Sequence, residues 1–169
     1  NPFYLDPTHP DAQALIVRDT KRIVEEWGYQ LIKHDFSTFD LFGEWGSTVK
    51  GFLANDGWHF RDRSKTSAEI VIDFYRLIKE AAGDCIILGC NVIGHLAAGL
   101  VEMNRTGDDT SGREWERTRK MGVNTLAFRM LQHKAFYDVD ADCVGVMGII
   151  PWKLNSEWLR ALSVSGTPL

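Results

Sequence analysis

The sequence is poor in the features that mark nucleic-acid-binding and membrane-spanning proteins. Its 19 Lys and Arg residues are outnumbered by 23 Asp and Glu residues, for a formal net charge of -4. Binding to nucleic acid relies on clustered basic side chains, and no such excess is present. No uninterrupted apolar run approaches the roughly 20 residues that cross a bilayer. We therefore expect neither a nucleic acid nor a membrane as a partner.

Cysteine and histidine are also sparse and unpaired. Cys85, Cys90 and Cys143 each lie in an apolar run, without the spacing of a disulfide framework or a zinc site. The five His residues form no HxxxH or HExxH pair, and no GxGxxG or Walker-type loop follows a predicted strand. The sequence therefore predicts no metal and no cofactor. Its first residues lack the basic and apolar regions of a signal peptide, so none is predicted.

What the chain does contain is an alternation of strand and helix patterns. Strands are predicted over residues 3–5, 29–36, 84–91, 100–103 and 135–146, with another beginning near 165. This order is typical of α/β proteins with a parallel sheet. An open doubly wound sheet and part of a (β/α)₈ barrel both fit the order. Because no nucleotide-binding loop is present, the nucleotide-binding version of the open sheet loses support.

Local signals predict where the helices begin. Thr66 and Glu69 form a capping box ahead of an amphipathic stretch that ends at residue 83. Ser111 and Glu114 have the same spacing and predict a second capping box. Asn155 is placed to cap the last helix, which has apolar residues on one face.

The segment of residues 37–64 is too long for an ordinary connection between a strand and a helix. It is rich in aromatic residues, among them Phe42, Trp45, Trp58 and Phe60. These side chains fit a stacking platform for a sugar, and they fit equally a small core within the insertion itself. We treat the whole chain, 1–169, as one domain that carries this insertion.

Polar residues gather where the predicted strands end. Because alternate strand residues share a face, Lys33 and Asp35 are expected to point the same way. A lysine beside this aspartate would keep its carboxylate ionised. Glycoside hydrolases use two carboxyl groups in unlike surroundings, one ionised and one protonated. Asp at a strand end is also common in turns and helix caps, which is the structural alternative. The further candidates are Asp6, Asn91, Arg105, Asp108, Asp109, Asp138, Asp140 and Asp142.

At these residues the sequence resembles a known family. WGYQLIKHDF is similar to the nucleophile strand of the α-galactosidase-like retaining glycosidases of clan D, which include melibiase and isomaltodextranase-type enzymes. In that family a Lys lies two residues before the nucleophilic Asp. NRTGDDTSGREW resembles the acid/base segment, in which an Arg precedes an Asp and then a Trp. LDPTHP, FYDVDADCVGV and SGTPL resemble other strand ends of these enzymes, in the same order along the chain.

The resemblance implies a (β/α)₈ TIM barrel present only in part, from about the third strand to the start of the eighth. It implies hydrolysis of α-linked sugars by retaining double displacement, with Asp35 as nucleophile and Asp109 as acid/base. Asp108 is the alternative acid/base. Oligosaccharides or glycosides are the implied partners, together with the missing barrel strands, and an extracellular or periplasmic location fits the family. The implied substrate-binding residues are Lys33, Asn91, Arg105, Asp140, Asp142 and Trp45.

Other interpretations of the same residues stay open. Cys90 is followed by Asn91, where family members often have an acidic residue and an aromatic one, which departs from the pattern for galactose. A Lys on a barrel strand can form a Schiff base, so Lys33 also fits an aldolase-like lyase. A catalytically inactive carbohydrate-binding relative is a third alternative. Lys33 and Arg105 also fit purely structural roles, as an ion pair and as a loop brace.

Overall fold

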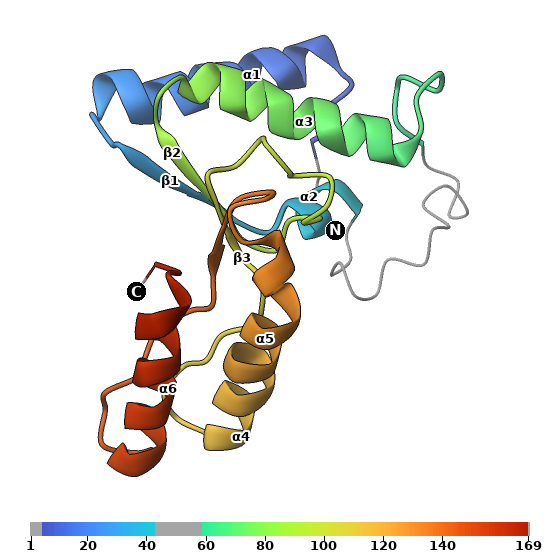
Figure 1. Cartoon of the computed structure of the whole chain (residues 1–169). Helices are drawn as coiled ribbons and strands as arrows, with labels where there is room; N and C mark the ends of the chain where they lie inside the picture. The colour runs from blue at the N-terminus through green and yellow to red at the C-terminus, as the bar shows by residue number, and fades with distance from the viewer. Residues whose placement is uncertain (1–4, 43–58, 169) are drawn as a thin grey trace. The chain divides into compact units, whose positions relative to one another are not determined.

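The computed structural model describes residues 5–42 and 59–168 (Figure 1). The chain divides into two compact units, Asn1–Glu102 and Met103–Leu169. In the described residues, each unit contains one pair of parallel strands together with helices that precede, connect or follow them in sequence. The α/β class with parallel strands is thus confirmed. Within the described residues, no helix combines the length and the apolar character needed to cross a membrane.

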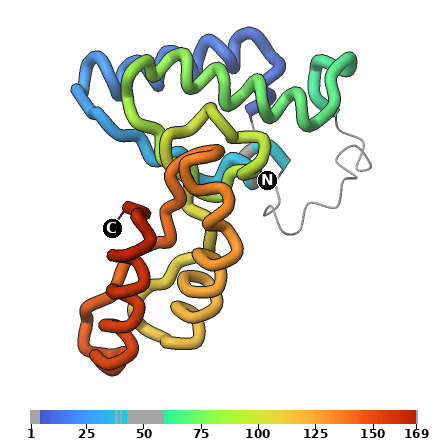
Figure 2. The backbone as a smooth tube through the Cα atoms, viewed as in Figure 1, coloured from blue at the N-terminus to red at the C-terminus, as the bar shows by residue number. Residues whose placement is uncertain are grey.

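The first unit is built around the parallel pair β1 and β2. Leu31 lies opposite Ile86, and His34 lies opposite Gly89. Helices α1 and α3 lie side by side, as Figures 1 and 2 show. The elements in order are α1 (Pro10–Lys21), a π-helical turn (Arg22–Glu26), β1 (Leu31–His34), α2 (Ser37–Phe42), α3 (Ser67–Ala82) and β2 (Ile86–Gly89).

Helix α3 begins where its capping box predicts. The Thr66 hydroxyl accepts a hydrogen bond from the Glu69 N–H, and the Glu69 carboxylate accepts one from the Thr66 N–H at 2.7 Å. These two bonds satisfy N–H groups that have no partner inside the helix. The helix ends at Gly83, whose φ is 58°. Its buried stripe consists of Ile70, Val71, Tyr75, Ile78 and Ala82.

The β1–β2 pair has one face toward α3, and the side chains of its other face are partly exposed. The His34 ring packs edge-on against Phe74 and Tyr75 of α3, with ring centres 5.3 and 5.8 Å away. On the other face, Leu31 and Ile86 are 46% and 41% exposed. Alternation along the strand puts Lys33 on this second face, as the sequence predicts.

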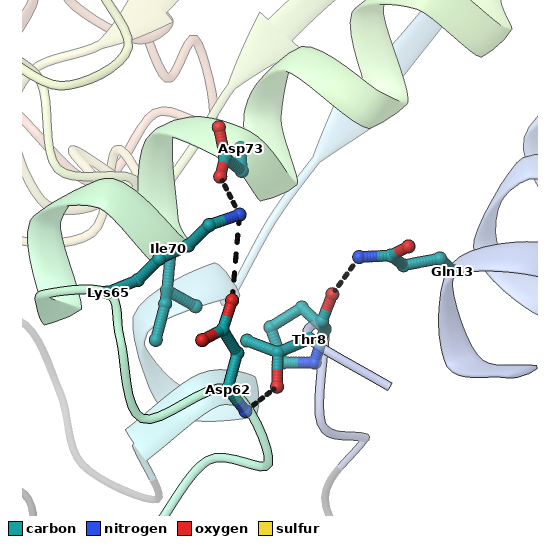
Figure 3. Close-up of a pocket in the computed structure, with 7 residues that line it drawn as sticks. Thr8, Gln13, Asp62, Lys65, Ile70 and Asp73 are labelled. Atoms are coloured by element: carbon teal, nitrogen blue, oxygen red, sulfur yellow. Dashed lines mark hydrogen bonds and ion pairs between the residues drawn. The ribbon is translucent and has the colours of Figure 1, made fainter. Parts of the chain in front are cut away.

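The chain that returns to α3 is tied to the N-terminal turn. The Arg61 N–H donates to Asp6 Oδ2 at 2.7 Å, and the Asp62 N–H donates to Thr8 Oγ1 at 3.0 Å. Asp6 also accepts from the Thr8 N–H and hydroxyl, so this strand-end aspartate serves a turn. The adjoining pocket, of about 40 Å³, is lined by Pro7, Thr8, Gln13, Asp62, Lys65, Ile70 and Asp73 (Figure 3). Such a volume is far below that of a typical ligand site, so we assign the pocket a structural role.

The second unit repeats the parallel pairing, with Met103 opposite Asp138 and Arg105 opposite Asp140. On the same two strands, Asn104 and Val139 are buried neighbours. The elements in order are β3 (Met103–Arg105), α4 (Trp115–Arg117), a π-helical stretch (Thr118–Asn124), α5 (Thr125–Arg129), a 3₁₀ turn (Met130–Gln132), β4 (Asp138–Asp140) and α6 (Trp152–Ser165).

Helix α6 is fixed in the second unit by Trp158. This side chain is almost completely buried, and its indole N–H donates to the Cys143 carbonyl at 3.3 Å. A Cβ placed on Gly122 would lie 2.9 Å from the Trp158 ring. The π-helical stretch therefore packs its glycine directly against the indole.

Several predicted boundaries are wrong. The strand predicted at residues 100–103 begins only at Met103. Glu102 precedes it, and its carboxylate accepts a hydrogen bond from the Ile87 N–H and pairs with Lys79. The strand predicted over 135–146 is limited to β4. Residues 166–168 form a turn and coil after α6, and most of the predicted strand at 3–5 lies outside the described residues.

Two predicted helix caps are also wrong. Ser111 does not cap α4; it lies in a left-handed turn with φ 50°, and Glu114 precedes the helix without a capping bond from its side chain. Asn155 lies inside α6, which already begins after Pro151. Its buried amide instead donates to the Gly145 carbonyl at 3.1 Å. In both cases contacts with the loop after β4 override the local pattern.

We predict that the stability of the protein falls in mild acid because of His34. Burial lowers the pKa of this imidazole to about 4, and the neighbouring Asp35 carboxylate offsets only part of that effect. The unfolded chain binds the proton more readily, so the contribution is complete above about pH 6.5 and lost as the pH falls toward 4. Between pH 7.5 and 5 the loss is about 2 kcal/mol of unfolding free energy.

Urea unfolding at the two pH values measures this loss. The variant His34→Phe keeps an aromatic ring against α3 but cannot be protonated. Its unfolding free energy should therefore depend less on pH, by about 2 kcal/mol over this range. Equal pH dependence in the variant and the parent would contradict the assignment.

Candidate active site

The carboxylate of Asp35 lies just beyond the end of β1 and is held on both oxygens. Its Oδ1 accepts hydrogen bonds from Asn91 Nδ2 at 2.7 Å and from the Phe36 N–H at 2.8 Å. Its Oδ2 lies 3.2 Å from the Lys33 ammonium. The Asp35 side chain is 21% exposed, so it is held firmly and still reaches the surface.

The charge on Asp35 follows from a balance of opposing effects. Partial burial alone would raise the pKa of this carboxyl. Hydrogen bonds from Asn91, from Lys33, from the Phe36 N–H and from the Cys90 thiol together outweigh the burial and lower the pKa below its ordinary value. Asp35 is therefore ionised at neutral pH. Sequence reasoning named Lys33 as the source of this effect, whereas Asn91 makes the larger contribution.

The contact between Asn91 and Asp35 was not predicted, although the strand register contains the signal for it. Asn91 lies two residues beyond β2, whose last residue, Gly89, is paired with His34. The ladder continues through a hydrogen bond of 2.8 Å from the Cys90 N–H to the His34 carbonyl. Parallel pairing therefore carries the two chain ends forward together and brings Asn91 beside Asp35.

The backbone around this contact is strained and braced. Phe36 and Asn91 both have left-handed φ values, 60° and 50°, a conformation that costs roughly 1–2 kcal/mol for most residues. The buried Ser37 hydroxyl donates to the Asn91 carbonyl at 3.2 Å and is 3.0 Å from the Tyr75 hydroxyl. The Tyr75 hydroxyl in turn accepts from the Ile93 N–H. This network connects the two loops to α3, which stabilises the strained turns.

The second unit holds an arginine among three carboxylates. Arg105 Nη1 lies 3.0 Å from Asp109 Oδ1 and 3.0 Å from Asp142 Oδ2. Its Nε donates to Asp140 Oδ2 at 3.2 Å. The side chains of Arg105, Asp140 and Asp142 are 12%, 15% and 11% exposed, whereas that of Asp109 is 69% exposed. Of the three carboxylates, Asp109 is thus the one open to a ligand.

Asp108 has a different partner. Its Oδ2 accepts from Arg117 at 2.8 Å, and its Oδ1 accepts from the Asp109 N–H at 2.7 Å. Arg117 Nε also donates to the Asp109 carbonyl at 2.6 Å. The two adjacent aspartates are thus each paired with an arginine, Asp108 with Arg117 and Asp109 with Arg105.

The loop that carries these aspartates is held by close backbone contacts. A Cβ on Gly107 would lie 2.0 Å from the Met121 carbonyl oxygen. A Cβ on Gly112, whose φ is 67°, would lie 2.4 Å from the Gly145 Cα. Only glycine leaves room at these two positions, so the loop has a defined path on both sides of Asp109.

The remaining candidates are placed as follows. Phe42 is buried and packs edge-on against Phe60, with ring centres 6.0 Å apart. For these two residues the contact favours a small core within the insertion over a stacking platform. Trp45 and Trp58 lie outside the described residues. In the described part of the chain, no group of three or more His, Cys, Asp and Glu side chains is arranged to hold a metal ion.

The chain is similar in fold to an alpha-galactosidase. It matches the alpha-galactosidase from Thermus thermophilus in complex with stachyose, with a TM-score of 0.68 and 16% identity over 96% of this chain and 34% of the other. It also matches the structure in complex with p-nitrophenyl alpha-D-galactopyranoside, with a TM-score of 0.65 and 16% identity over 96% and 33% of the two chains. No protein-family model matches the sequence, and neither does any curated protein.

These matches confirm the fold class as part of a TIM barrel. The chain spans about a third of the length of the solved structures that it matches. The likeness lies in the fold, since identity is 16% in both comparisons.

We predict that Arg105 is essential to the stability of the second unit. The variant Arg105→Met leaves the two nearly buried carboxylates, Asp140 and Asp142, without their cation. Removing one partner of a buried ion pair costs several kcal/mol, so we expect roughly 3 kcal/mol less unfolding free energy. Urea unfolding followed by circular dichroism measures the change.

Arg119→Met is the matched control. The Arg119–Glu116 pair has a similar length, 2.7 Å, but both side chains are more than two-fifths exposed. An exposed pair is worth less than about 1 kcal/mol. Similar losses of unfolding free energy in the two variants would show that burial of the ion pairs around Arg105 adds nothing to stability.

Proposed function

We propose that the protein is a glycoside hydrolase that acts on α-linked sugars by retaining double displacement, with Asp35 as the nucleophile. The observation that carries the proposal is the ionised Asp35 carboxylate at the end of β1, beside the Lys33 ammonium. The fold, which matches an alpha-galactosidase over 96% of this chain, supports it. A retaining nucleophile must be ionised when the substrate binds, and the contacts of Asp35 meet this requirement.

In the first step Asp35 attacks the anomeric carbon and forms a covalent glycosyl ester. The bond from that carbon to the leaving oxygen breaks, and Asp109 donates a proton to this oxygen. In the second step Asp109 removes a proton from water, which attacks the same carbon and releases Asp35 as a carboxylate. Each step inverts the anomeric centre, so the product keeps the α configuration.

The assignment of Asp109 rests on its exposure and on its place in the chain. Its side chain is the most exposed of the carboxyls around Arg105, and it lies in the loop after β3. In TIM-barrel enzymes the reactive groups come from the C-terminal ends of the strands, which is where Asp35 and Asp109 both lie. Asp108 is the alternative acid/base, since it occupies the adjacent position and is also exposed.

The remaining residues are assigned supporting roles. Lys33 is 45% exposed, and its ammonium is available to a sugar hydroxyl while it neutralises Asp35. Arg105 orients Asp109 and is itself held by Asp140 and Asp142. Trp45 is proposed to contact the substrate, as an aromatic residue of the insertion. A Schiff-base lyase needs Lys33 as a neutral amine in an apolar pocket, and the ion pair with Asp35 does not favour that role.

We predict that Asp35→Gly in the full-length protein abolishes turnover of aryl α-galactosides. The loss in kcat should be at least about a thousandfold, as for other enzymes that lose their nucleophile. Sodium azide should restore cleavage by attacking the anomeric carbon in place of Asp35, and the product should be the β-glycosyl azide. Mass spectrometry and NMR identify this product. Wild-type kcat in Asp35→Gly would contradict the assignment.

We predict that Asp109→Asn and Asp108→Asn separate the two acid/base candidates. Loss of the acid should slow substrates with poor leaving groups by roughly a hundred- to ten-thousandfold. Substrates with an activated leaving group, such as a dinitrophenol, need no proton and should be affected far less in the first step. Azide should then give the α-glycosyl azide with the acid/base variant only. If Asp108→Asn shows this leaving-group dependence and azide product and Asp109→Asn does not, Asp108 is the acid/base residue.

A further inference from the structure

We propose that Asn91 is a positioning residue that determines which oxygen of Asp35 attacks the sugar. Asn91 holds Oδ1 in place, so Oδ2 is the oxygen that forms the bond to the anomeric carbon. This inference rests on the proposed role of Asp35 as the nucleophile. It differs from the role that the family resemblance implies for Asn91, which is contact with the substrate.

The two oxygens of Asp35 have partners of different kinds. Oδ1 receives two donors with fixed directions, the Asn91 amide at 2.7 Å and the Phe36 N–H at 2.8 Å. Oδ2 faces the Lys33 ammonium at 3.2 Å, and the carboxylate also accepts a hydrogen bond from the Cys90 thiol, which is a weak donor. A lysine ammonium ends a flexible four-carbon chain and can move to a sugar hydroxyl when substrate arrives. Oδ2 is therefore the oxygen that can be released for attack.

The position of Asn91 is itself fixed by the fold. Its backbone is left-handed, with φ 50°, a conformation that asparagine adopts more readily than most residues. Its carbonyl accepts from the buried Ser37 hydroxyl, which is linked to Tyr75 of α3. The amide that orients Asp35 is thus anchored through its own backbone to a helix of the first unit.

The same contact serves both steps of the reaction. When Oδ2 bonds to the sugar, Oδ1 becomes the carbonyl oxygen of the ester and still accepts from Asn91 and the Phe36 N–H. When water later displaces the ester, negative charge returns to the carboxylate. Donors already aimed at Oδ1 stabilise that charge without any reorganisation. Loss of the amide should therefore lower kcat rather than weaken substrate binding.

The variant Asn91→Gly tests the inference in the full-length protein with aryl α-galactosides. Glycine is compatible with the left-handed backbone and removes the side chain together with its amide. We expect kcat to fall about ten- to a hundredfold and KM to change less than about threefold. Because the amide helps to lower the pKa of Asp35, the acid limb of the kcat/KM profile should move to higher pH. Asp84→Gly, an exposed turn residue of the same unit, is the matched control, and thermal unfolding of both variants checks the fold.

The outcomes separate this inference from the proposed function. A rise in KM with an unchanged kcat and acid limb would assign Asn91 to substrate binding and overturn the inference. Wild-type kinetics in Asn91→Gly would also overturn it. If Asp35→Gly, tested in parallel, shows neither loss of turnover nor azide product, the proposed function fails together with the inference. Asn91→Asp should lose more activity than Asn91→Gly, since it puts a carboxylate against Oδ1.

Discussion

The parallel pairing of β1 with β2 is the constraint on which the first half of the proposed site depends. The register places His34 opposite Gly89, and the ladder continues past the strand ends through Cys90. The two chains therefore leave the strands at the same edge, with Asp35 and Asn91 in hydrogen-bonding contact. A shift of one residue would turn Lys33 to the other face and break this contact.

Alternation along each strand places the packed side chains on one face and the charged side chains on the other. In β1, His34 packs against α3 and stays neutral because it is buried, whereas Lys33 lies on the opposite face beside Asp35. The second unit follows the same rule. Asn104 is buried on one face of β3, and Arg105 on the other face meets its carboxylates. Each strand can thus be stabilised by its helices and still present charge.

Local sequence signals predicted elements well where the residues involved were close together in the chain. The capping box before α3 needs only Thr66 and the residue three positions later, so it formed as predicted. The same pattern failed at Ser111, because the neighbouring Gly112 is in contact with the distant Gly145. Asn155 failed as a cap for a related reason, since its amide binds the carbonyl of that same glycine.

The sequence by itself determined the alternation of strands and helices, and with it the common face of Lys33 and Asp35, because a strand has a side-chain period of two. Only the tertiary structure decided which groups hold Asp35 and Arg105. Asn91 lies 56 residues from Asp35, and Asp140 lies 35 residues from Arg105. Contacts over such separations depend on register and on left-handed turns that many residues stabilise together, so no local pattern contains them.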